Sequence, residues 1–299
     1  GLNQADLTSD DMYYTKAEMK SMIQNYRKLG LDIIPEFDTP AHSLSFTKVR
    51  PDLRFGTTGR QNDHFNLNTK YDESLAFVES IWDEYIKGDD PVFDQDTIVN
   101  IGTDEYDGQY TEQFRKFTDD LLAYIQDNGN TVRLWGSLTA RSGSTSVRSE
   151  GAQMNIWNDG WANPKAMYQQ GYDLIDMNDG RVYIVPAAGY YADYLSRQSM
   201  YNYDPATRMG VPSGSEQTLG GAYAIWNDMV DQRANGLTEM EIYDRFNDAA
   251  PYYAAALWGK SGEVSFAAAQ QTSENVGEAP GVNAYDKAES ETVEILSDD

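Results

Sequence analysis

The chain has 299 residues, 40% of them hydrophobic, which is enough for one large α/β domain or two small ones. Its 48 acidic and 23 basic residues give a formal net charge of −25, which argues against nucleic acids and anionic membranes as partners, because their phosphates would be repelled. No cysteine is present, so disulfides and thiolate metal sites are excluded, and no apolar run is long enough for membrane insertion within this chain.

The first predicted elements are a helix and a buried strand. Thr15 and Glu18 match a capping box, which predicts the start of a helix after a polar opening loop, and Gly30 ends it. The residues expected on the buried side of this helix are Met19, Met22, Ile23 and Tyr26. The apolar stretch at residues 31–38 then predicts a buried strand.

Helices and strands alternate through the rest of the chain. The predicted strands are residues 97–102, 131–136, 152–157, 172–178, 182–186 and 220–226. The predicted helices are residues 72–88, 111–129, 163–171 and 238–258. About six β-α units of this kind indicate a parallel sheet, and polar residues at the strand ends favour a (β/α)8 barrel. A doubly wound sheet fits the alternation equally well, but it would usually carry a Gly-rich phosphate loop after its first strand.

Two acidic residues stand side by side where the strand 97–102 ends. Asp104 and Glu105 follow Gly102, which permits the chain to twist so that both carboxylates serve one site. Close carboxylates push their pKa values apart, which suits one staying ionised while the other holds a proton. A solvated pair of loop acids is the alternative, and a metal site would want more histidines than His42 and His64.

Asp38 and His42 follow the first predicted strand. A carboxylate four positions from a histidine can orient the ring and raise its basicity. The same spacing also occurs in a capped turn with a surface histidine, so by itself it decides little.

Aromatic residues with acidic neighbours recur at later strand ends. Trp135 and Trp157 close two strands, Tyr191 and Asp193 form a Tyr-x-Asp pair, and Trp226 and Asp228 form a Trp-x-Asp pair. A sugar pocket needs flat apolar faces together with a few polar groups, so this pattern favours a carbohydrate site. Each pair taken singly would also fit a core aromatic beside a surface acid.

Four stretches, in this order along the chain, give a resemblance to glycoside hydrolase family 20, the β-N-acetylhexosaminidases and lacto-N-biosidases. "IPEFDTPAHS" is similar to the family's IPE-acid-x-P-G-H stretch, and "NIGTDEY" to its H-x-G-G-D-E stretch. "YYADY" and "IWND" resemble its later Tyr-x-Asp and Trp-x-acid stretches. The resemblance covers residues 14–258 and implies a (β/α)8 barrel enzyme that needs no cofactor and no metal.

The resemblance implies a role for each matching residue. Glu105 matches the general acid/base, and Asp104 the residue that holds the substrate's 2-acetamido group, whose carbonyl oxygen is the nucleophile. Tyr191 matches the hydroxyl that hydrogen-bonds this carbonyl, and Asp38 with His42 matches a relay that tunes the general acid. The residues implied in substrate binding are Trp135, Trp157, Asp193, Trp226 and Asp228.

The sequence also departs from the family pattern. Asn100 stands where the family has His, and Thr103 where it has a second Gly. Asp228 stands where the exo-hexosaminidases usually have Glu, and the shorter acid could leave room for a further sugar. The expected reaction is therefore retaining, substrate-assisted release of lacto-N-biose (Gal-β1,3-GlcNAc) or of terminal GlcNAc or GalNAc. An exo-β-N-acetylhexosaminidase and a non-catalytic glycan-binding module stay open as alternatives, and a metal-dependent hydrolase is a more distant one.

The organisation of the chain follows from these assignments. Residues 1–261 are expected to form the catalytic barrel without its first two β-α units, which would lie further upstream in the natural protein, and without them the fragment is expected to be poorly stable and weakly active. Residues 262–299 are acidic and poor in large apolar residues, which predicts a linker or disordered tail. The expected partner is an oligosaccharide or glycoconjugate, and the expected location is secreted or cell-surface, with any signal peptide outside this chain.

Overall fold

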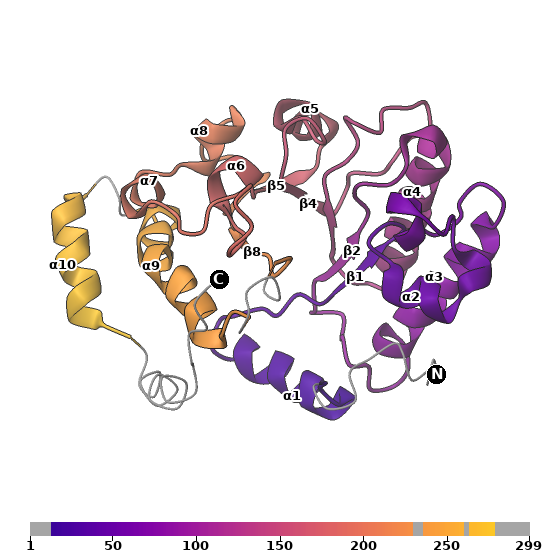
Figure 1. Ribbon diagram of the computed structural model, residues 1–299, viewed down its shortest axis with the longest axis horizontal. Coiled ribbons are helices and arrows are strands. Elements are labelled where there is room, and N and C mark those ends of the chain that lie inside the picture. The colour runs from indigo at the N-terminus through magenta and orange to yellow at the C-terminus, as the bar shows by residue number, and fades with distance from the viewer. Residues whose placement is uncertain (1–12, 230–235, 260–262, 279–299) are drawn as a thin grey trace, which may run out of the picture. The chain divides into compact units, whose positions relative to one another are not determined.

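The computed structural model describes residues 13–229, 236–259 and 263–278 (Figure 1). The chain divides into two compact units, Gly1–Leu174 and Ile175–Asp299. The first unit carries the strand ends that hold the adjacent acids, and the second carries the later Tyr-x-Asp and Trp-x-Asp pairs.

The first unit is built on a parallel sheet whose strands lie side by side in chain order. These strands are β1 (Glu36–Thr39), β2 (Val99–Gly102), β3 (Val132–Trp135) and β4 (Ala152–Ile156). Glu36 is opposite Asn100, and Trp135 is opposite Asn155. Because the strands are parallel, their carboxyl ends meet at one edge of the sheet, as the alternating pattern predicts.

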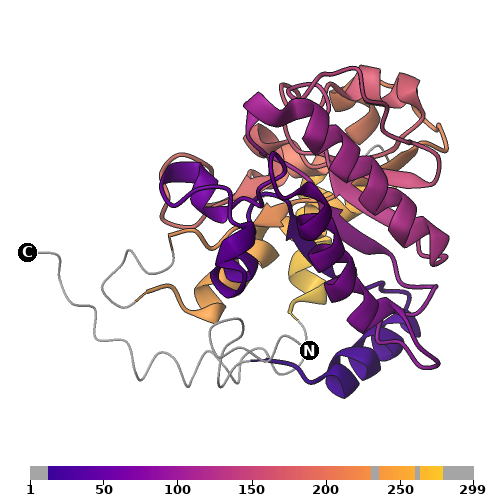
Figure 2. The same ribbon diagram turned by 90° about the vertical axis from the view of Figure 1, so that its right-hand side faces the viewer.

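Helices of the first unit cover the sheet and connect its strands. They are α1 (Lys16–Arg27), α2 (Leu44–Val49), α3 (Tyr71–Ile86), α4 (Thr111–Asp127) and α5 (Pro164–Gln170), with short 3-10 turns at Pro51–Leu53, Gly59–Asp63 and Gly108–Tyr110. Phe37 in β1 packs against Trp82 of α3 with ring centroids 4.7 Å apart. Successive strand residues point to opposite faces of a sheet. Glu36 and Asp38, which flank Phe37 in β1, therefore point away from α3. Figure 2 shows the same helices running beside the strands.

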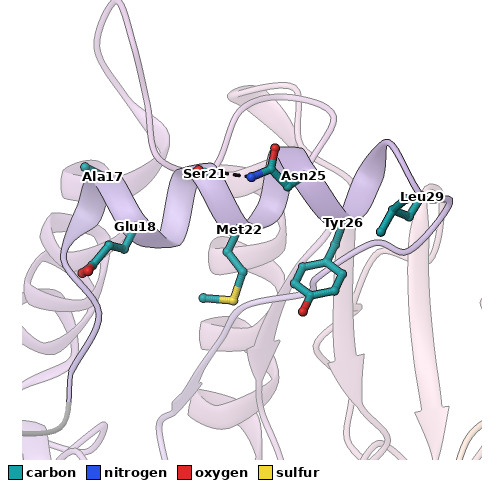
Figure 3. Close-up of a pocket in the computed structure, with 7 residues that line it drawn as sticks. All are labelled: Ala17, Glu18, Ser21, Met22, Asn25, Tyr26 and Leu29. Carbon is teal, nitrogen blue, oxygen red and sulfur yellow. Dashed lines mark hydrogen bonds between the residues drawn. The ribbon is translucent and has the colours of Figure 1, made fainter. Parts of the chain in front are cut away.

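Helix α1 begins at the predicted capping box, with Thr15 and Glu18 each satisfying the other's backbone N–H. Only Ile23 of its four expected core residues is buried. Met22 and Tyr26 instead line a groove of about 650 Å³ along the helix, on the same side as Glu18 (Figure 3). The prediction of a fully buried side was wrong, because all the described residues that line this groove belong to α1 or to the turn directly after it. The groove brings together no cluster of titratable groups among the described residues that line it.

The second unit contains short strands and helices around an aromatic core. Its elements are α6 (Asp179–Val182), β6 (Tyr183–Ile184), α7 (Arg197–Tyr201), α8 (Pro205–Met209), β7 (Thr218–Gly221), β8 (Ala224–Ile225), α9 (Glu239–Leu257) and α10 (Phe266–Val276), and β5 (Asp173–Asp176) spans the boundary between the units. Strands β6 and β8 pair in parallel. Val182, Ile184, Tyr201, Tyr252 and Tyr253 belong to one buried cluster.

The architecture agrees with the predicted α/β class, with one correction in the tail. Helix α10 lies inside the segment predicted to be a linker or disordered, because its run of alanines favours a helix despite the acidic surroundings. Residues 279–299 lie outside the described residues. Among the described strands no closed ring is formed. Among the described residues, no helix is both long and apolar enough to cross a membrane.

Candidate active site

The side chains of the first unit that could take part in catalysis or binding lie at the ends of its strands or directly after them. Asp38 lies in β1, Asp104 and Glu105 follow β2, Trp135 ends β3, and Trp157 follows β4. The common edge of the parallel strands therefore gathers residues that are far apart in sequence. This is the position at which a (β/α)8 enzyme places its active site.

A tight turn at the end of β2 aims the two adjacent acids. Gly102, Thr103 and Glu105 have positive φ angles of 73°, 68° and 47°, a region that is costly for residues with a side chain. A Cβ atom at Gly102 would lie 1.8 Å from Asp38 Oδ1, so glycine is needed for space as well as for conformation. The predicted twist at Gly102 is confirmed.

Asp104 packs against Asp38, and it shares His42 as a neighbour with Glu105. The Oδ1 atoms of Asp38 and Asp104 are both buried with no hydrogen-bond donor from the described residues. Burial raises the pKa of Asp38 well above its usual range, and burial likewise raises the pKa of Asp104. A proton held by Asp38 can be donated to Asp104, which keeps Asp104 the more acidic of the two. Asp38 and Asp104 therefore form a second close carboxyl pair, in addition to the adjacent acids Asp104 and Glu105.

His42 joins the two adjacent acids. Its Nε2 lies 3.3 Å from Glu105 Oε2 and 3.8 Å from Asp104 Oδ1. The hydrogen bond with Glu105 is the main effect that raises the pKa of His42 to about 9, although burial opposes it. The raised pKa favours the imidazolium form of His42, which is positioned to stabilise negative charge on Glu105.

Asp63 is a partner of His42 that sequence reasoning missed. Asp63 Oδ2 lies 3.9 Å from His42 Nδ1, and Asp63 Oδ1 lies 2.5 Å from His64 Nδ1. Burial works against ionisation of Asp63, but its contacts with His64 and His42 hold its pKa below the usual range. The carboxylate on the far side of His42 is therefore Asp63, whereas Asp38 was the expected one. A turn at 59–63 supplies it, and no sequence spacing relates the two residues.

Tyr106 anchors the loop that carries Asp63. Its ring stacks on His64 at 5.0 Å, and its hydroxyl donates to Phe65 O and accepts from Leu67 N. Asp107 caps the next turn by accepting from Gln109 N. The aromatic and acidic residues directly after Glu105 are thus structural supports for the site.

Glu36 is a second residue that sequence reasoning missed. Its Oε1 accepts from Trp135 Nε1 at 3.1 Å, and its Oε2 accepts from Asn100 Nδ2 at 2.5 Å. The loss of hydration around the carboxylate raises the pKa of Glu36 to about 7. Glu36 as a whole residue is exposed to solvent. Its pKa depends on the surroundings of the two carboxylate oxygens, where protonation takes place. The sequence could have indicated Glu36, because residues two apart in a strand point to the same face of the sheet, and Glu36 stands two positions before Asp38.

Trp157 is held beside the end of β3. Its Nε1 donates to Gly136 O at 2.9 Å, and its ring stacks on Trp161 with centroids 5.7 Å apart. Trp135 and Trp157 are 6% and 8% exposed, so each offers only a small part of its ring to a ligand.

Three groups of the cluster also have the spacing of metal ligands. The ligand atoms of Asp38, His42 and Asp104 lie within 4.8 Å of one another. Two carboxylates and one imidazole can serve a divalent cation, and the same groups are suited to proton transfer and charge stabilisation.

The second unit gathers the remaining predicted residues around Tyr183. The Tyr191 and Trp226 rings each lie 5.6 Å from the Tyr183 ring. The Tyr191 hydroxyl donates to Asp179 Oδ2 at 2.9 Å. These contacts fix the orientation of both aromatic side chains within the unit.

The two acids of the second unit are paired with different neighbours. Asp193 forms an ion pair with Arg245 at 3.0 Å, and Asp228 accepts a hydrogen bond from the Tyr190 hydroxyl at 3.1 Å. The structure thus groups the predicted site residues into two sets, one in each unit.

The sequence matches the profile described as "Glycosyl hydrolase family 20, catalytic domain" over residues 2–258. It is 22% identical over 257 residues to a lacto-N-biosidase of Bifidobacterium bifidum, which covers 78% of this chain and 22% of that protein. It is 23% identical over 247 residues to the human β-hexosaminidase subunit beta, covering 73% of this chain and 41% of that protein. The chain thus spans less than half the length of these curated relatives.

Solved structures share the fold. A chitobiase of Flavobacterium johnsoniae aligns with a TM-score of 0.67 at 18% identity and covers 90% of this chain and 42% of that one. A β-N-acetylhexosaminidase from Bacteroides fragilis aligns with a TM-score of 0.63 at 19% identity and covers 86% of this chain and 53% of that one. Both likenesses extend through most of the chain.

Proposed function

The chain belongs to glycosyl hydrolase family 20, and from this premise we propose that it hydrolyses β-linked N-acetylhexosamine glycosides with retention of configuration. The observation that carries this proposal is the different surroundings of two neighbouring acids. Asp104 lies against the buried carboxyl group of Asp38, and His42 Nε2 lies closer to Glu105 than to Asp104, at 3.3 Å and 3.8 Å. Neighbouring carboxylates in different surroundings are suited to separate tasks.

In the first step, Glu105 reacts in its protonated form, although His42 favours the carboxylate, and donates that proton to the glycosidic oxygen as the C1–O bond breaks. The carbonyl oxygen of the substrate's 2-acetamido group attacks C1 and closes an oxazolinium ring, so the protein supplies no nucleophile. Asp104, kept ionised by a hydrogen bond from Asp38, accepts the acetamido N–H and stabilises the positive charge that develops there. His42 stabilises the carboxylate left on Glu105.

In the second step, the Glu105 carboxylate removes a proton from a water molecule, which attacks C1 and opens the ring. Two inversions at C1 give net retention. Asp63 contributes by holding His42 from the Nδ1 side, so that Nε2 stays directed at Glu105.

The remaining predicted residues are assigned to substrate binding within the same proposal. In the first unit, Trp135 and Trp157 are proposed as apolar surfaces for a sugar ring. For the second unit we keep the roles that the family resemblance implies: Trp226 as an apolar surface, Asp193 and Asp228 as acceptors from sugar hydroxyls, and Tyr191 as a donor to the acetamido carbonyl in place of its present bond to Asp179.

We further propose that the substrate is a glycan from which the disaccharide Gal-β1,3-GlcNAc is released. Support comes from Asp228, which has a shorter side chain than the Glu that is usual at this place, and from the similarity to a lacto-N-biosidase. Release of a single terminal GlcNAc or GalNAc is the second candidate, supported by the similarity to β-hexosaminidases. Secretion or surface display of the chain belongs to the same proposal.

Kinetics on paired chromogenic substrates test both levels of the proposal. The 4-nitrophenyl β-glycosides of GlcNAc and of Gal-β1,3-GlcNAc are compared, with Glu105→Gln as the inactive control. Hydrolysis of either substrate by the wild type supports the reaction class, and a higher kcat/KM on the disaccharide supports the narrower specificity. Binding of the glycans without any turnover would instead favour a glycan-binding module.

A further inference from the structure

Glu36 receives hydrogen bonds from donors on two neighbouring strands. Oε1 accepts from Trp135 Nε1 at 3.1 Å, and Oε2 accepts from Asn100 Nδ2 at 2.5 Å. Trp135 and Asn100 are 6% and 4% exposed, so neither donor has bulk water as an easy substitute. Losing the acceptor would leave buried N–H groups unsatisfied.

The orientation of the Asn100 amide is fixed from its other side. Its Oδ1 accepts from the backbone N–H of Gly102 at 3.0 Å, and a backbone N–H can only donate. Asn100 must therefore present Nδ2 to Glu36. The indole N–H of Trp135 can also only donate, so position 36 faces two donors and requires two acceptor oxygens. A carboxylate meets this requirement, whereas a carboxamide does not.

The surroundings of Glu36 disfavour its negative charge. A carboxylate kept at such a position indicates that its hydrogen bonds have a role. The charged groups that face it are Asp104 and Asp38, which oppose its ionisation, and His42, which favours it. A neutral carboxamide would avoid the repulsion, but it offers only one acceptor oxygen.

The hydrogen bonds of Glu36 connect two parts of the proposed site. Gly102 begins the turn that carries Asp104 and Glu105, and Trp135 stands at the end of the next strand. We propose that Glu36 is a positioning residue that locks the Trp135 wall and the Asp104–Glu105 turn into one geometry, so that the acetamido group meets both. This inference rests on the proposed function, because it assigns Trp135 and Asp104 to the same sugar.

The donor and acceptor pattern provides a swap experiment. Glu36→Gln places an NH₂ group against one of the two donors. Asn100→Asp places two carboxylates against each other. The double variant Glu36→Gln/Asn100→Asp restores every pair. The amide introduced at position 36 accepts from Trp135 and donates to the carboxylate introduced at position 100, which still accepts from Gly102. The double variant also keeps the negative charge, which moves from position 36 in β1 to position 100 in β2.

Two readouts are measured on the full chain, with circular dichroism to confirm folding. One is kcat/KM on the chromogenic N-acetylhexosaminide that the wild type hydrolyses best. The other is solvent exchange of the Trp135 indole N–H by NMR, assigned with Trp135→Phe, which needs no activity. Glu73→Gln serves as the matched control, since Glu73 is an exposed residue of α3 paired with Lys70.

The expected results are a loss of about 10- to 100-fold in kcat/KM and faster indole exchange in each single variant, since misplacement of about 1 Å can cost 100-fold. The double variant should recover at least a tenth of wild-type kcat/KM and the slow exchange, and Glu73→Gln should behave as wild type. Wild-type values in Glu36→Gln would overturn the inference, as would a double variant no better than the singles. A single variant too unstable to assay leaves the double variant to decide. Absence of turnover in the wild type would contradict the proposed function, whereas the indole exchange would still decide on the hydrogen-bond link.

Discussion

His42 Nε2 lies 3.3 Å from Glu105 Oε2, and its other ring nitrogen faces Asp63 at 3.9 Å. The ring therefore stands between two carboxylates from different loops. Its positive charge favours the ionised form of each and so stabilises Glu105 after proton donation. This relationship makes the acid/base role of Glu105 open to direct tests.

Glu105→Gln removes the transferable proton and keeps the size of the side chain. We expect turnover of 4-nitrophenyl N-acetylhexosaminides to fall by about 10²–10⁴-fold, the usual contribution of general acid–base catalysis. Binding of a thiazoline that mimics the oxazolinium should remain measurable by calorimetry. Near wild-type turnover in this variant would show that Glu105 is not the acid/base.

Asp104→Asn removes the charge that is proposed to stabilise the acetamido nitrogen. We expect kcat to fall by about 100-fold or more, because preorganised charge near a developing cation is a large catalytic term. The thiazoline should also bind more weakly than to the wild type, since the variant lacks the carboxylate partner. Unchanged thiazoline affinity would argue that Asp104 does not contact this group.

The ionisation of His42 should appear in the dependence of stability on pH. The pKa of His42 is raised in the folded state to about 9 from an ordinary value of 6.5, so its contribution is complete below about pH 6.5 and is lost as the pH rises through about 9. The side chain is 43% exposed, and after allowance for solvent screening the contribution is on the order of 1 kcal/mol.

Urea unfolding of the wild type and of His42→Gln at pH 6 and at pH 9.5 checks this prediction. The difference in the free energy of unfolding between the two proteins should be larger at pH 6. Using the difference removes the titration of groups common to both proteins. An equal difference at the two pH values would mean that His42 has no raised pKa in the folded protein.

Gly102→Ala should destabilise the protein more than Gly30→Ala. Both glycines have positive φ, 73° and 80°, so both variants carry the conformational cost of about 1–2 kcal/mol. A Cβ at Gly102 would also meet Asp38 Oδ1 at 1.8 Å, whereas a Cβ at Gly30 meets nothing within 4 Å. The overlap should add about 1–3 kcal/mol, measured by urea unfolding. Equal losses in the two variants would contradict the close approach of Asp38 to the turn.

The turn that carries the two acids could be predicted from sequence, because it depends on residues that are neighbours along the chain. Gly102 before Asp104 and Glu105 predicts a turn that brings two acids to one edge, and the structure has that turn. The alternation of strands and helices likewise predicts the parallel sheet whose edge they share.

The partners of these acids could not be predicted in the same way, because they are set by tertiary contacts. Asp63 reaches His42 from a loop held by Tyr106, and Glu36 meets Trp135 across two strand spacings. The pairing of Asp104 with Asp38 depends on the register between β1 and β2. The groove along α1 shows the same limit, since helical periodicity gives the apolar side of a helix but not what covers it.

The central claim is that the substrate's own acetamido group is the nucleophile, assisted by Asp104. The most direct measurement is the rate on 4-nitrophenyl β-glycosides whose N-acetyl group carries zero, one, two or three fluorine atoms. Each fluorine weakens the carbonyl oxygen as a nucleophile, so the account predicts a steep and progressive fall in kcat/KM, and no turnover of the plain β-glucoside. A rate that does not change with fluorination, or ready hydrolysis of the glucoside, would contradict it and indicate a nucleophile supplied by the protein.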